Sequence, residues 1–357
     1  MKSPYQDKLL GLLRDPRWLT LFFVVAAGVL SVAYFGEVLL PFVIAAVIAY
    51  FLDGGVRRLG EIWPKKRLYT CLAVYVVFIL FYLVLVIGPL NIALRQMLQL
   101  ARNFPEISQK FRQLSQDSIE ALATVIPMDQ QKQIANLLSS QFHENAQLLL
   151  EKAAGSLNQV GAWLIYLGLV PVLVFFLLKD KEGLQKSVLR LLPPERELVE
   201  RVWWETEAKI ANYIRGKVWE VLMVAAVSWS VFAFLGFRYA AIMGLVSGIS
   251  VIVPFVGVIG AALPLFLLGY VQWGGGWELG QLMISYGVIQ LVDAYVVVPL
   301  MFSEAVQLHP IFILMAVLVF GSLWGVWGVF FAIPLATLGK SLLVTLLDDL
   351  ESAQKPG

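Results

Sequence analysis

A carboxylic acid and an amide lie three residues apart in an apolar run near the end of the sequence. Gln290 and Asp293 share one face of the helix predicted over 279–300, which Pro299 closes. The run is long enough to cross a bilayer, and an ionisable side chain at that depth costs about 3 kcal/mol or more unless it meets water or a partner. The pair is therefore predicted to line a substrate or ion pathway. The alternative is an Asp293 that hydrogen-bonds to a neighbouring helix or lies nearer the membrane surface.

Two more polar side chains precede the last apolar segment. Glu304 and His309 lie shortly before Pro310. Histidine changes charge near neutral pH, so His309 is predicted either to handle protons or simply to cap or pack the start of a helix. Both residues join Gln290 and Asp293 as candidates for the pathway.

The motifs of common catalytic sites are missing from the sequence. It contains no GxxxxGK[ST] phosphate loop and no HExxH zinc motif, and its only histidines are His143 and His309. The single cysteine, Cys71, rules out an intramolecular disulfide and a cysteine metal cluster. We therefore expect no enzyme activity, no catalytic residues, no metal site and no cofactor.

The composition is that of an integral membrane protein. Of the 357 residues, 59% are hydrophobic and 15% are charged, whereas soluble domains carry about 25% charged residues. Mean hydropathy is +0.77. The apolar runs are continuous rather than alternating, which favours helices over a β-barrel. An all-α fold in the bilayer is predicted, and the net charge of +2 gives no sign of nucleic-acid binding.

The apolar runs divide the chain into spans and connecting segments. The first run, 18–52, is too long for one helix, and Gly36 and Glu37 predict a turn between two. Lysine and arginine collect in the connecting loops, which predicts that these loops and both termini are cytoplasmic. By parity, the polar segment with helical spacing is extracytoplasmic and amphipathic. The predicted order is spans one to three with their basic loop 53–68 in 1–92, the amphipathic segment in 93–157, span four in 158–178, a cytoplasmic linker in 179–217, a transport core in 218–346 and a cytoplasmic tail in 347–357.

Two long apolar segments, 239–271 and 309–346, carry glycine and proline in their middles. Each combines a small-xxx-small motif, which lets helices approach closely, with a proline-broken second half. Paired broken helices are typical of transporters built from internal repeats, because unwound backbone offers polar groups to a solute. The alternative is that glycine and proline are simply common in membrane helices. The predicted helix breaks or hinges are Gly244, Gly248, Pro254, Gly257, Gly260, Pro264, Pro299, Pro310, Gly321, Gly325, Gly328 and Pro334.

Four stretches of this half carry a family resemblance. They are GLVSGISVIVPFVG from Gly244, Asp293 with Pro299, FSEAVQLHP from Phe302 and GSLWGVWGVFFAIP from Gly321. Together with the order of the spans, they resemble the AI-2E family of bacterial membrane proteins, in its PerM-like permease branch. The resemblance implies about eight membrane segments, two of them broken or re-entrant, the bacterial inner membrane, a homo-oligomer such as a pentamer, and a transport role. Members are linked to export of the autoinducer-2 signal and to sodium/proton antiport.

Three functions stay open on the sequence. The first is a permease or exporter of a small polar solute, such as an autoinducer-2-like signalling molecule, that works by alternating access around the broken helices. The second is a Na⁺(Li⁺)/H⁺ antiporter that uses Asp293, alone or with His309. The third is an envelope scaffold that binds a partner through 93–157. The expected contacts are the lipid bilayer, a small polar solute or monovalent cation, and further copies of the chain.

Overall fold

The computed structural model describes residues 16–63, 67–120, 160–191, 197–254, 256–302 and 309–352. Regular structure within these ranges is helical, without a strand, which confirms the predicted all-α fold. Among the described residues, six helical stretches are long and apolar enough to cross a membrane, and there are two shorter apolar helices, Tyr166–Lys179 and Ala240–Ser250. The number of membrane crossings, predicted as about eight, stays a prediction.

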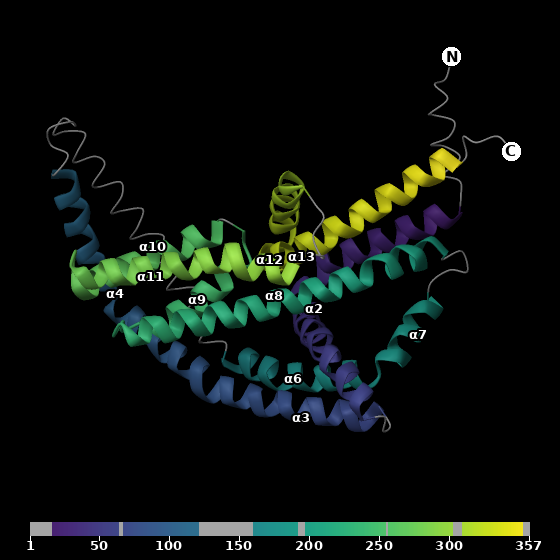
Figure 1. Cartoon of the computed structure of the whole chain (residues 1–357), viewed down its shortest axis with the longest axis horizontal. Coiled ribbons are helices and arrows are strands. Elements are labelled where there is room, and N and C mark those ends of the chain that lie inside the picture. Colours follow the sequence, from purple (N-terminus) through teal and green to yellow (C-terminus); the bar gives the residue numbers. More distant parts are fainter. Residues whose placement is uncertain are drawn as a thin grey trace, which may run out of the picture. The chain divides into compact units, whose positions relative to one another are not determined.

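The chain forms two compact units. The first unit comprises Met1–Ile79, Gly168–Trp219 and Val297–Gly357, and the second comprises Leu80–Leu167 and Glu220–Val296. The described helices, labelled in Figure 1 where there is room, are α2 (Pro16–Ile62), α3 (Arg67–Leu85), η1 (Val86–Leu90), α4 (Asn91–Glu120), α6 (Val160–Lys179), α7 (Lys181–Leu191), α8 (Glu197–Phe234), α9 (Ala240–Ser250), α10 (Val256–Trp273), α11 (Trp277–Val292), η2 (Asp293–Val297), α12 (Val298–Phe302) and α13 (Pro310–Ser352).

Helix α2 differs from the predicted pair of helices joined by a turn. It is helical through Gly36 and Glu37, so the predicted turn is wrong. Pro41 lies inside the helix, where it has no N–H to donate and its ring crowds the preceding turn, and such prolines kink helices. Figure 1 shows two arms of α2 that run in different directions. The predicted loop 53–68 is also helical as far as Ile62, where α2 ends.

The third predicted span does not end near Ile92. Helix α3 passes through a π-helical turn, η1, into α4, so the chain stays helical to Glu120. The wider turn falls where Pro89 cannot donate an N–H to the helical ladder. Helix α4 is the start of the predicted amphipathic segment 93–157, of which residues 121–157 lie outside the described part of the chain.

Side chains of α3 bond to carbonyl groups of α6. In the first unit, the thiol of the buried Cys71 donates to the carbonyl oxygen of Leu178 at 3.8 Å. In the second unit, the Tyr82 hydroxyl donates to the carbonyl oxygen of Leu167 at 2.9 Å. That carbonyl lacks its usual helical donor, because the residue four positions later is Pro171. The tyrosine therefore satisfies a backbone group that the proline leaves open.

The same arrangement recurs in the first unit. Pro334 lies inside α13 and leaves the carbonyl of Phe330 without its helical donor. The hydroxyl of the buried Tyr213 in α8 donates to that oxygen at 3.1 Å. Because lipid offers no hydrogen bonds, a tyrosine at this place makes the proline tolerable in a membrane helix.

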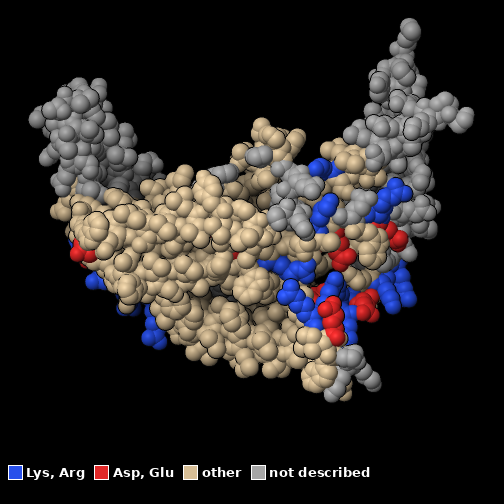
Figure 2. All heavy atoms as spheres, in the orientation of Figure 1, with Lys and Arg blue, Asp and Glu red and all other residues tan. Residues whose placement is uncertain are grey.

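Large apolar side chains cover the outside of several helices. On α3, Val76, Val77, Leu80, Phe81 and Val84 are each more than half exposed within the chain. The face of the molecule in Figure 2 is mostly uncharged, with the acidic and basic side chains gathered in a few places. Such a surface suits contact with hydrocarbon rather than with water.

The core of the second unit forms around a helical hairpin. Helices α9 and α10 pack on each other, and because only a short turn joins Ser250 to Val256, they run in opposite directions. Helix α10 also packs on α11, and α4 packs on α9 and α10. The buried side chains at the centre include Ile107, Phe232, Met243, Leu265, Leu268, Leu282 and Tyr286.

Two glycines bring α9 against α8 at backbone distance. A Cβ on Gly244 would lie 2.7 Å from the Cβ of Trp229. A Cβ on Gly248 would lie 2.5 Å from the Cβ of Ala225 and 2.6 Å from the carbonyl oxygen of Val221. This small-xxx-small pair therefore packs one helix on another. Its role as a hinge stays a prediction.

Both long apolar segments turn a corner that only glycine fits. In the hairpin, a Cβ on Gly257 would overlap the carbonyl oxygen of Ser250. In α13, Gly325 adopts φ 61° and ψ −138°, and a Cβ on Gly328 would overlap the carbonyl oxygen of Phe320. Among the described residues, the helical path is thus broken at 251–254 in the first segment and at Gly325 in the second. The other predicted break residues of these segments and of α12 lie within helices or at their ends: Gly260, Pro264, Pro299, Pro310, Gly321 and Pro334.

Gly257→Ala should destabilise the protein. The added methyl group meets the carbonyl of Ser250, and overpacking of this kind costs about 1–3 kcal/mol. The measurement is the free energy of unfolding in mixed micelles as the fraction of sodium dodecyl sulfate rises. Gly260→Ala is the control, since nothing lies within 4 Å of its Cβ position, and it should be neutral or stabilising by up to about 1 kcal/mol. Equal losses in the free energy of unfolding of the two variants would contradict the close contact between Gly257 and the carbonyl of Ser250.

Tyr213→Phe should lower the same free energy of unfolding by about 1 kcal/mol or more, because it leaves the buried carbonyl of Phe330 without a donor. Tyr295→Phe removes a hydroxyl from a side chain that is 76% exposed and should change nothing measurable. Equal free energies of unfolding in the two variants would show that the Tyr213 hydroxyl does not satisfy the carbonyl of Phe330.

Candidate functional site

The packing of α10 on α11 sets which residues lie level with the hairpin turn. Near the end of α10, a Cβ on Gly269 would lie 2.8 Å from the side chain of Leu279 at the start of α11. Closer to the turn, the Tyr286 hydroxyl donates to the carbonyl oxygen of Val258 at 2.7 Å. The two helices are therefore antiparallel. In this register, the last turn of α11 and the start of η2 lie level with the hairpin turn.

The packing of α9 on α8 shows which residues of α8 lie level with the hairpin turn. Gly244 faces Trp229, whereas Gly248 faces Ala225 and Val221, so these helices are antiparallel as well. As α9 proceeds toward the hairpin turn, it faces progressively earlier residues of α8. The hairpin turn itself therefore lies level with Glu220 of α8.

Three buried polar side chains consequently share the level of the hairpin turn. Glu220 of α8 is 1% exposed, Gln290 of α11 is 8% exposed and Asp293 of η2 is 7% exposed. Buried amides and carboxyl groups are unfavourable unless partners, water or a ligand meet them. We call Glu220, Gln290 and Asp293 the polar level.

Gln290 shows that this level is incompletely satisfied by the chain. Both its amide oxygen and its amide nitrogen are buried without a hydrogen-bond partner among the described residues. The hydroxyl of Ser228, two turns along α8 from Glu220, is in the same state. An unsatisfied buried polar group costs about 1–3 kcal/mol. Buried polar groups in native proteins are usually hydrogen-bonded, so these groups could accept a water molecule or a solute as partner.

Asp293 lies where the helix widens. The residues Asp293–Val297 form a π-helical turn directly after α11, and such turns occur frequently at functional sites. The turn shifts the phase of the helix, so it changes the direction in which this carboxyl is presented relative to a continuous α-helix. Gln290 and Asp293, which the sequence analysis places on one helix face, thus lie level with the turn of the α9–α10 hairpin.

The hairpin turn itself offers polar backbone groups. The C-terminal end of α9 and the N-terminal end of α10 both meet there, and helix ends carry carbonyl and N–H groups without helical partners. Some are satisfied locally: the N–H groups of Ile252 and Val253 donate to the carbonyls of Ile249 and Ser250 at 3.1 Å. The partial charges of two helix ends remain at the turn, where they can orient a polar molecule.

Of the other two predicted pathway residues, the structure describes one. His309 is exposed at the start of α13, in the first unit, and its Nδ1 accepts the N–H of Ile311 at 3.4 Å, as a residue that caps a helix start does. Glu304 lies outside the described residues. Their roles in transport stay predictions.

The sequence analysis missed Glu220. The sequence predicts a transport core that starts at residue 218, so that Glu220 would lie at the membrane surface. In the structure α8 begins at Glu197, and the stretch long and apolar enough to cross a membrane runs over Thr206–Phe234, so Glu220 lies in its middle. A signal existed: Glu220, Val224, Ser228 and Phe232 follow at intervals of four, the spacing of one helix face, and all four are buried.

These helices define a multi-pass α-helical membrane protein with buried polar side chains inside its helical core. The chain belongs to the AI-2E transporter family, whose family model matches residues 21–348. The predicted resemblance is therefore confirmed, and with it the assignment to membrane transport.

Named relatives span nearly the whole chain. "Putative permease PerM" of Escherichia coli (strain K12) is 35% identical over 329 residues, which covers 92% of this chain and 93% of the relative. "Putative transport protein YueF" of Bacillus subtilis (strain 168) is 22% identical and covers 91% of this chain and 88% of the relative. "AI-2 transport protein TqsA" of E. coli (strain K12) is 22% identical and covers 90% and 92%.

Gln290→Met should raise the free energy of unfolding by about 1 kcal/mol, because it replaces an amide without partners by an apolar side chain of similar length. Gln281→Met, at a partly exposed position of the same helix, is the control and should bring no such gain. The measurement is again unfolding in mixed micelles. A loss of stability in Gln290→Met would mean that the amide is bonded in the folded protein.

Proposed function

We propose that this chain carries a small polar solute across the bacterial inner membrane, and that the solute binds at the polar level beside the turn of the α9–α10 hairpin. The single observation that carries the proposal is the burial of Glu220, Gln290 and Asp293 level with a broken pair of helices. Broken helices within a membrane are tolerated where they line a cavity, and they place backbone groups around a solute.

The length of α9 supports a re-entrant hairpin. Its 11 residues reach about 16 Å, roughly half of the hydrocarbon layer of about 30 Å. A turn at that depth lies near the middle of the membrane. Helix α10 has 18 residues, and its last turn carries Tyr270, Gln272 and Trp273, residue types suited to the membrane surface. On this reading α8 and α11 cross the membrane in opposite directions, and the hairpin enters from the side where α8 ends.

Contacts of helix α4 indicate on which side of the membrane the open end of the hairpin lies, where α9 begins and α10 ends. Its Gln96 side chain accepts the N–H of Ile242 at 3.0 Å, and its Lys110 ammonium donates to the carbonyl oxygen of Val271 at 2.9 Å. Both partners lie at the open end of the hairpin. Since charge and parity predict that α4 follows an outward crossing, we propose that the hairpin enters from the extracytoplasmic side. The amphipathic surface of α4 is then partly occupied by its own chain, which disfavours the scaffold alternative.

The donors and acceptors of the polar level suit a solute with several hydroxyl groups. Carboxylates accept hydrogen bonds, and the amide of Gln290 both donates and accepts. The relative TqsA is named for AI-2 transport. An autoinducer-2-like sugar derivative is accordingly the first solute to test, with alternating access around the broken helices as the mechanism and a homo-oligomer as the expected assembly.

A second candidate is a Na⁺(Li⁺)/H⁺ antiporter. Ion-coupled exchangers concentrate ionisable groups within the membrane, and the sequence analysis identified one carboxyl group inside a predicted span, that of Asp293. Glu220 now adds a second buried carboxyl group at the same level. Two carboxyl groups can bind a monovalent cation or protons in exchange, so this observation favours keeping the antiporter as the alternative.

Asp293→Asn should lower transport by about tenfold or more, because a charge-assisted contact is worth about 1.5–3 kcal/mol. Glu220→Gln should do the same. The assay compares purified wild type and variants in proteoliposomes for uptake of labelled autoinducer-type sugars and for dissipation of a pH gradient by Na⁺ or Li⁺. Glu278→Gln, which neutralises an exposed carboxyl at the start of α11, is the control and should keep full activity.

The flux that responds to the substitutions identifies the class of solute. Sugar uptake lost in both variants supports the first proposal, and cation-driven proton movement lost in both supports the antiporter. A wild-type flux that survives in Asp293→Asn and in Glu220→Gln would place the pathway away from the polar level.

A further inference from the structure

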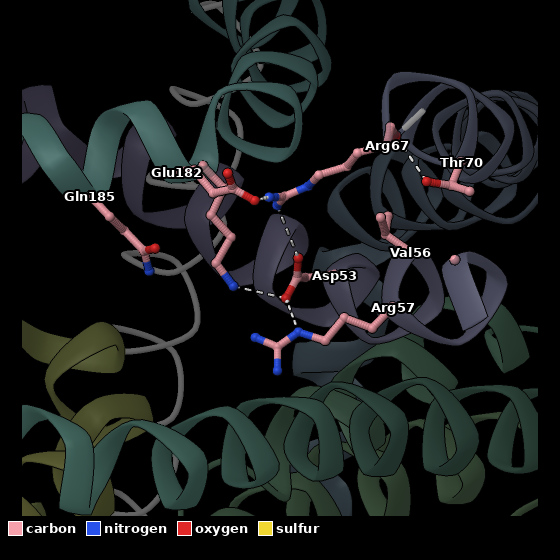
Figure 3. Close-up of a pocket in the computed structure, with 9 residues that line it drawn as sticks. Asp53, Val56, Arg57, Arg67, Thr70, Glu182 and Gln185 are labelled. Atoms are coloured by element: carbon pink, nitrogen blue, oxygen red, sulfur yellow. Dashed lines mark hydrogen bonds and ion pairs between the residues drawn. The ribbon is translucent and has the colours of Figure 1, made fainter. Parts of the chain in front are cut away.

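A polar cavity belongs to the first unit, whereas the polar level belongs to the second. A cavity of about 420 Å³ opens where α2, α3 and α7 meet. Figure 3 shows basic side chains from all three helices that converge on Asp53. The cavity is lined by Asp53, Val56, Arg57, Gly60, Arg67, Thr70, Lys181, Glu182 and Gln185, and we call it the basic pocket.

The carboxyl of Asp53 organises the cations of the basic pocket. It is buried and accepts from Arg57 Nε at 2.9 Å and from Lys181 Nζ at 2.8 Å, and Arg67 Nη2 lies 4.0 Å away. Arg67 also pairs with Glu182. Three cations thus face two carboxylates, which leaves one positive charge in excess. Because each cation belongs to a different helix, Asp53 holds their side chains in one place.

Arg57 keeps donors available for a ligand. Its side chain is 63% exposed, and its ion pair with Asp53 uses Nε. The ion pair fixes the plane of the guanidinium, while the two terminal amino groups point away from the carboxylate in Figure 3. A guanidinium fixed in this way matches the geometry of phosphate oxygens, which it can bind through two parallel hydrogen bonds. The amide of Gln185 and the ammonium of Lys181 line the same cavity.

The surroundings of the basic pocket indicate a lipid rather than a soluble molecule. The pocket lies at the ends of the apolar helices α2 and α3 and directly after α6. Next to it in the chain, Ile62, Trp63, Leu68 and Tyr69 are 44–80% exposed. A phosphate in the pocket would therefore have apolar and aromatic side chains nearby to accompany acyl chains. Basic pockets between membrane helices bind anionic headgroups in this way.

We propose that the basic pocket binds the phosphate group of an anionic membrane lipid, which bridges the end of α2 and the starts of α3 and α7. Inorganic phosphate has the same charge and oxygens, so the two sources are separated by experiment. The proposal does not depend on the transported solute, because it concerns residues of the first unit only.

The test is the thermal stability of delipidated full-length protein in detergent, titrated with phosphatidylglycerol, with phosphatidylcholine or with sodium phosphate. Phosphatidylglycerol should stabilise wild type, and Arg57→Gln should need about tenfold more of it, since one charge-assisted contact is lost. Arg58→Gln is the matched control: it removes the same charge from the neighbouring exposed residue, which does not line the pocket. Arg57→Lys keeps the charge but not the planar fork and should fall between them.

Each outcome decides the proposal. A response to phosphatidylglycerol that is weakened in Arg57→Gln and Arg57→Lys but kept in Arg58→Gln supports it. An equal response in Arg57→Lys and Arg58→Gln overturns it, even where Arg57→Gln fails to fold. Stabilisation by phosphatidylcholine to the same degree also overturns it, since no anion is then recognised. Stabilisation by sodium phosphate alone, with the same dependence on Arg57, overturns the lipid as the source.

Discussion

The structure depends on one constraint: a backbone surrounded by hydrocarbon must satisfy its own hydrogen bonds. Helices meet the constraint, and every proline inside a helix violates it once. The hydroxyls of Tyr82 and Tyr213 bond to the carbonyls of Leu167 and Phe330, each four residues before a proline. At these two prolines, a side chain from a neighbouring helix supplies the hydrogen bond that the proline cannot donate. That requirement ties helices together pairwise.

The fold also depends on glycine residues, which let the helix backbones approach closely. At Gly248 and Gly257 the absence of a side chain lets one backbone lie directly on another. The hairpin can then turn within a densely packed core, and its turn reaches the level of Glu220, Gln290 and Asp293. Polar groups inside a membrane protein lower its stability, so their retention at one level points to a use. The closest backbone contacts lie at these glycines, and the buried polar side chains lie about one helical turn beyond them.

The sequence predicted the all-α fold, the two broken segments and the family, because apolar length and glycine patterns are local signals. It failed at Gly36 and Glu37, where proline kinks α2 without ending it, and near Ile92, where a π turn continues the helix. Both failures have one cause: in a membrane, helical hydrogen bonding persists through residues that would end a helix in water. Gln290 and Asp293 were found because they share a face, whereas Glu220 needed the extent of α8. The basic pocket needed tertiary contacts, since Asp53 and Lys181 are far apart in sequence.

The burial of Cys71 makes the protein suitable for labelling experiments with introduced cysteines. The only thiol is 2% exposed and donates to a carbonyl group, so water-soluble maleimides should scarcely reach it. A cysteine introduced anywhere else would be the sole reactive group without prior removal of a native one. The rate at which such a label attaches on either arm of the hairpin, with and without solute, would then report from which side of the membrane water enters.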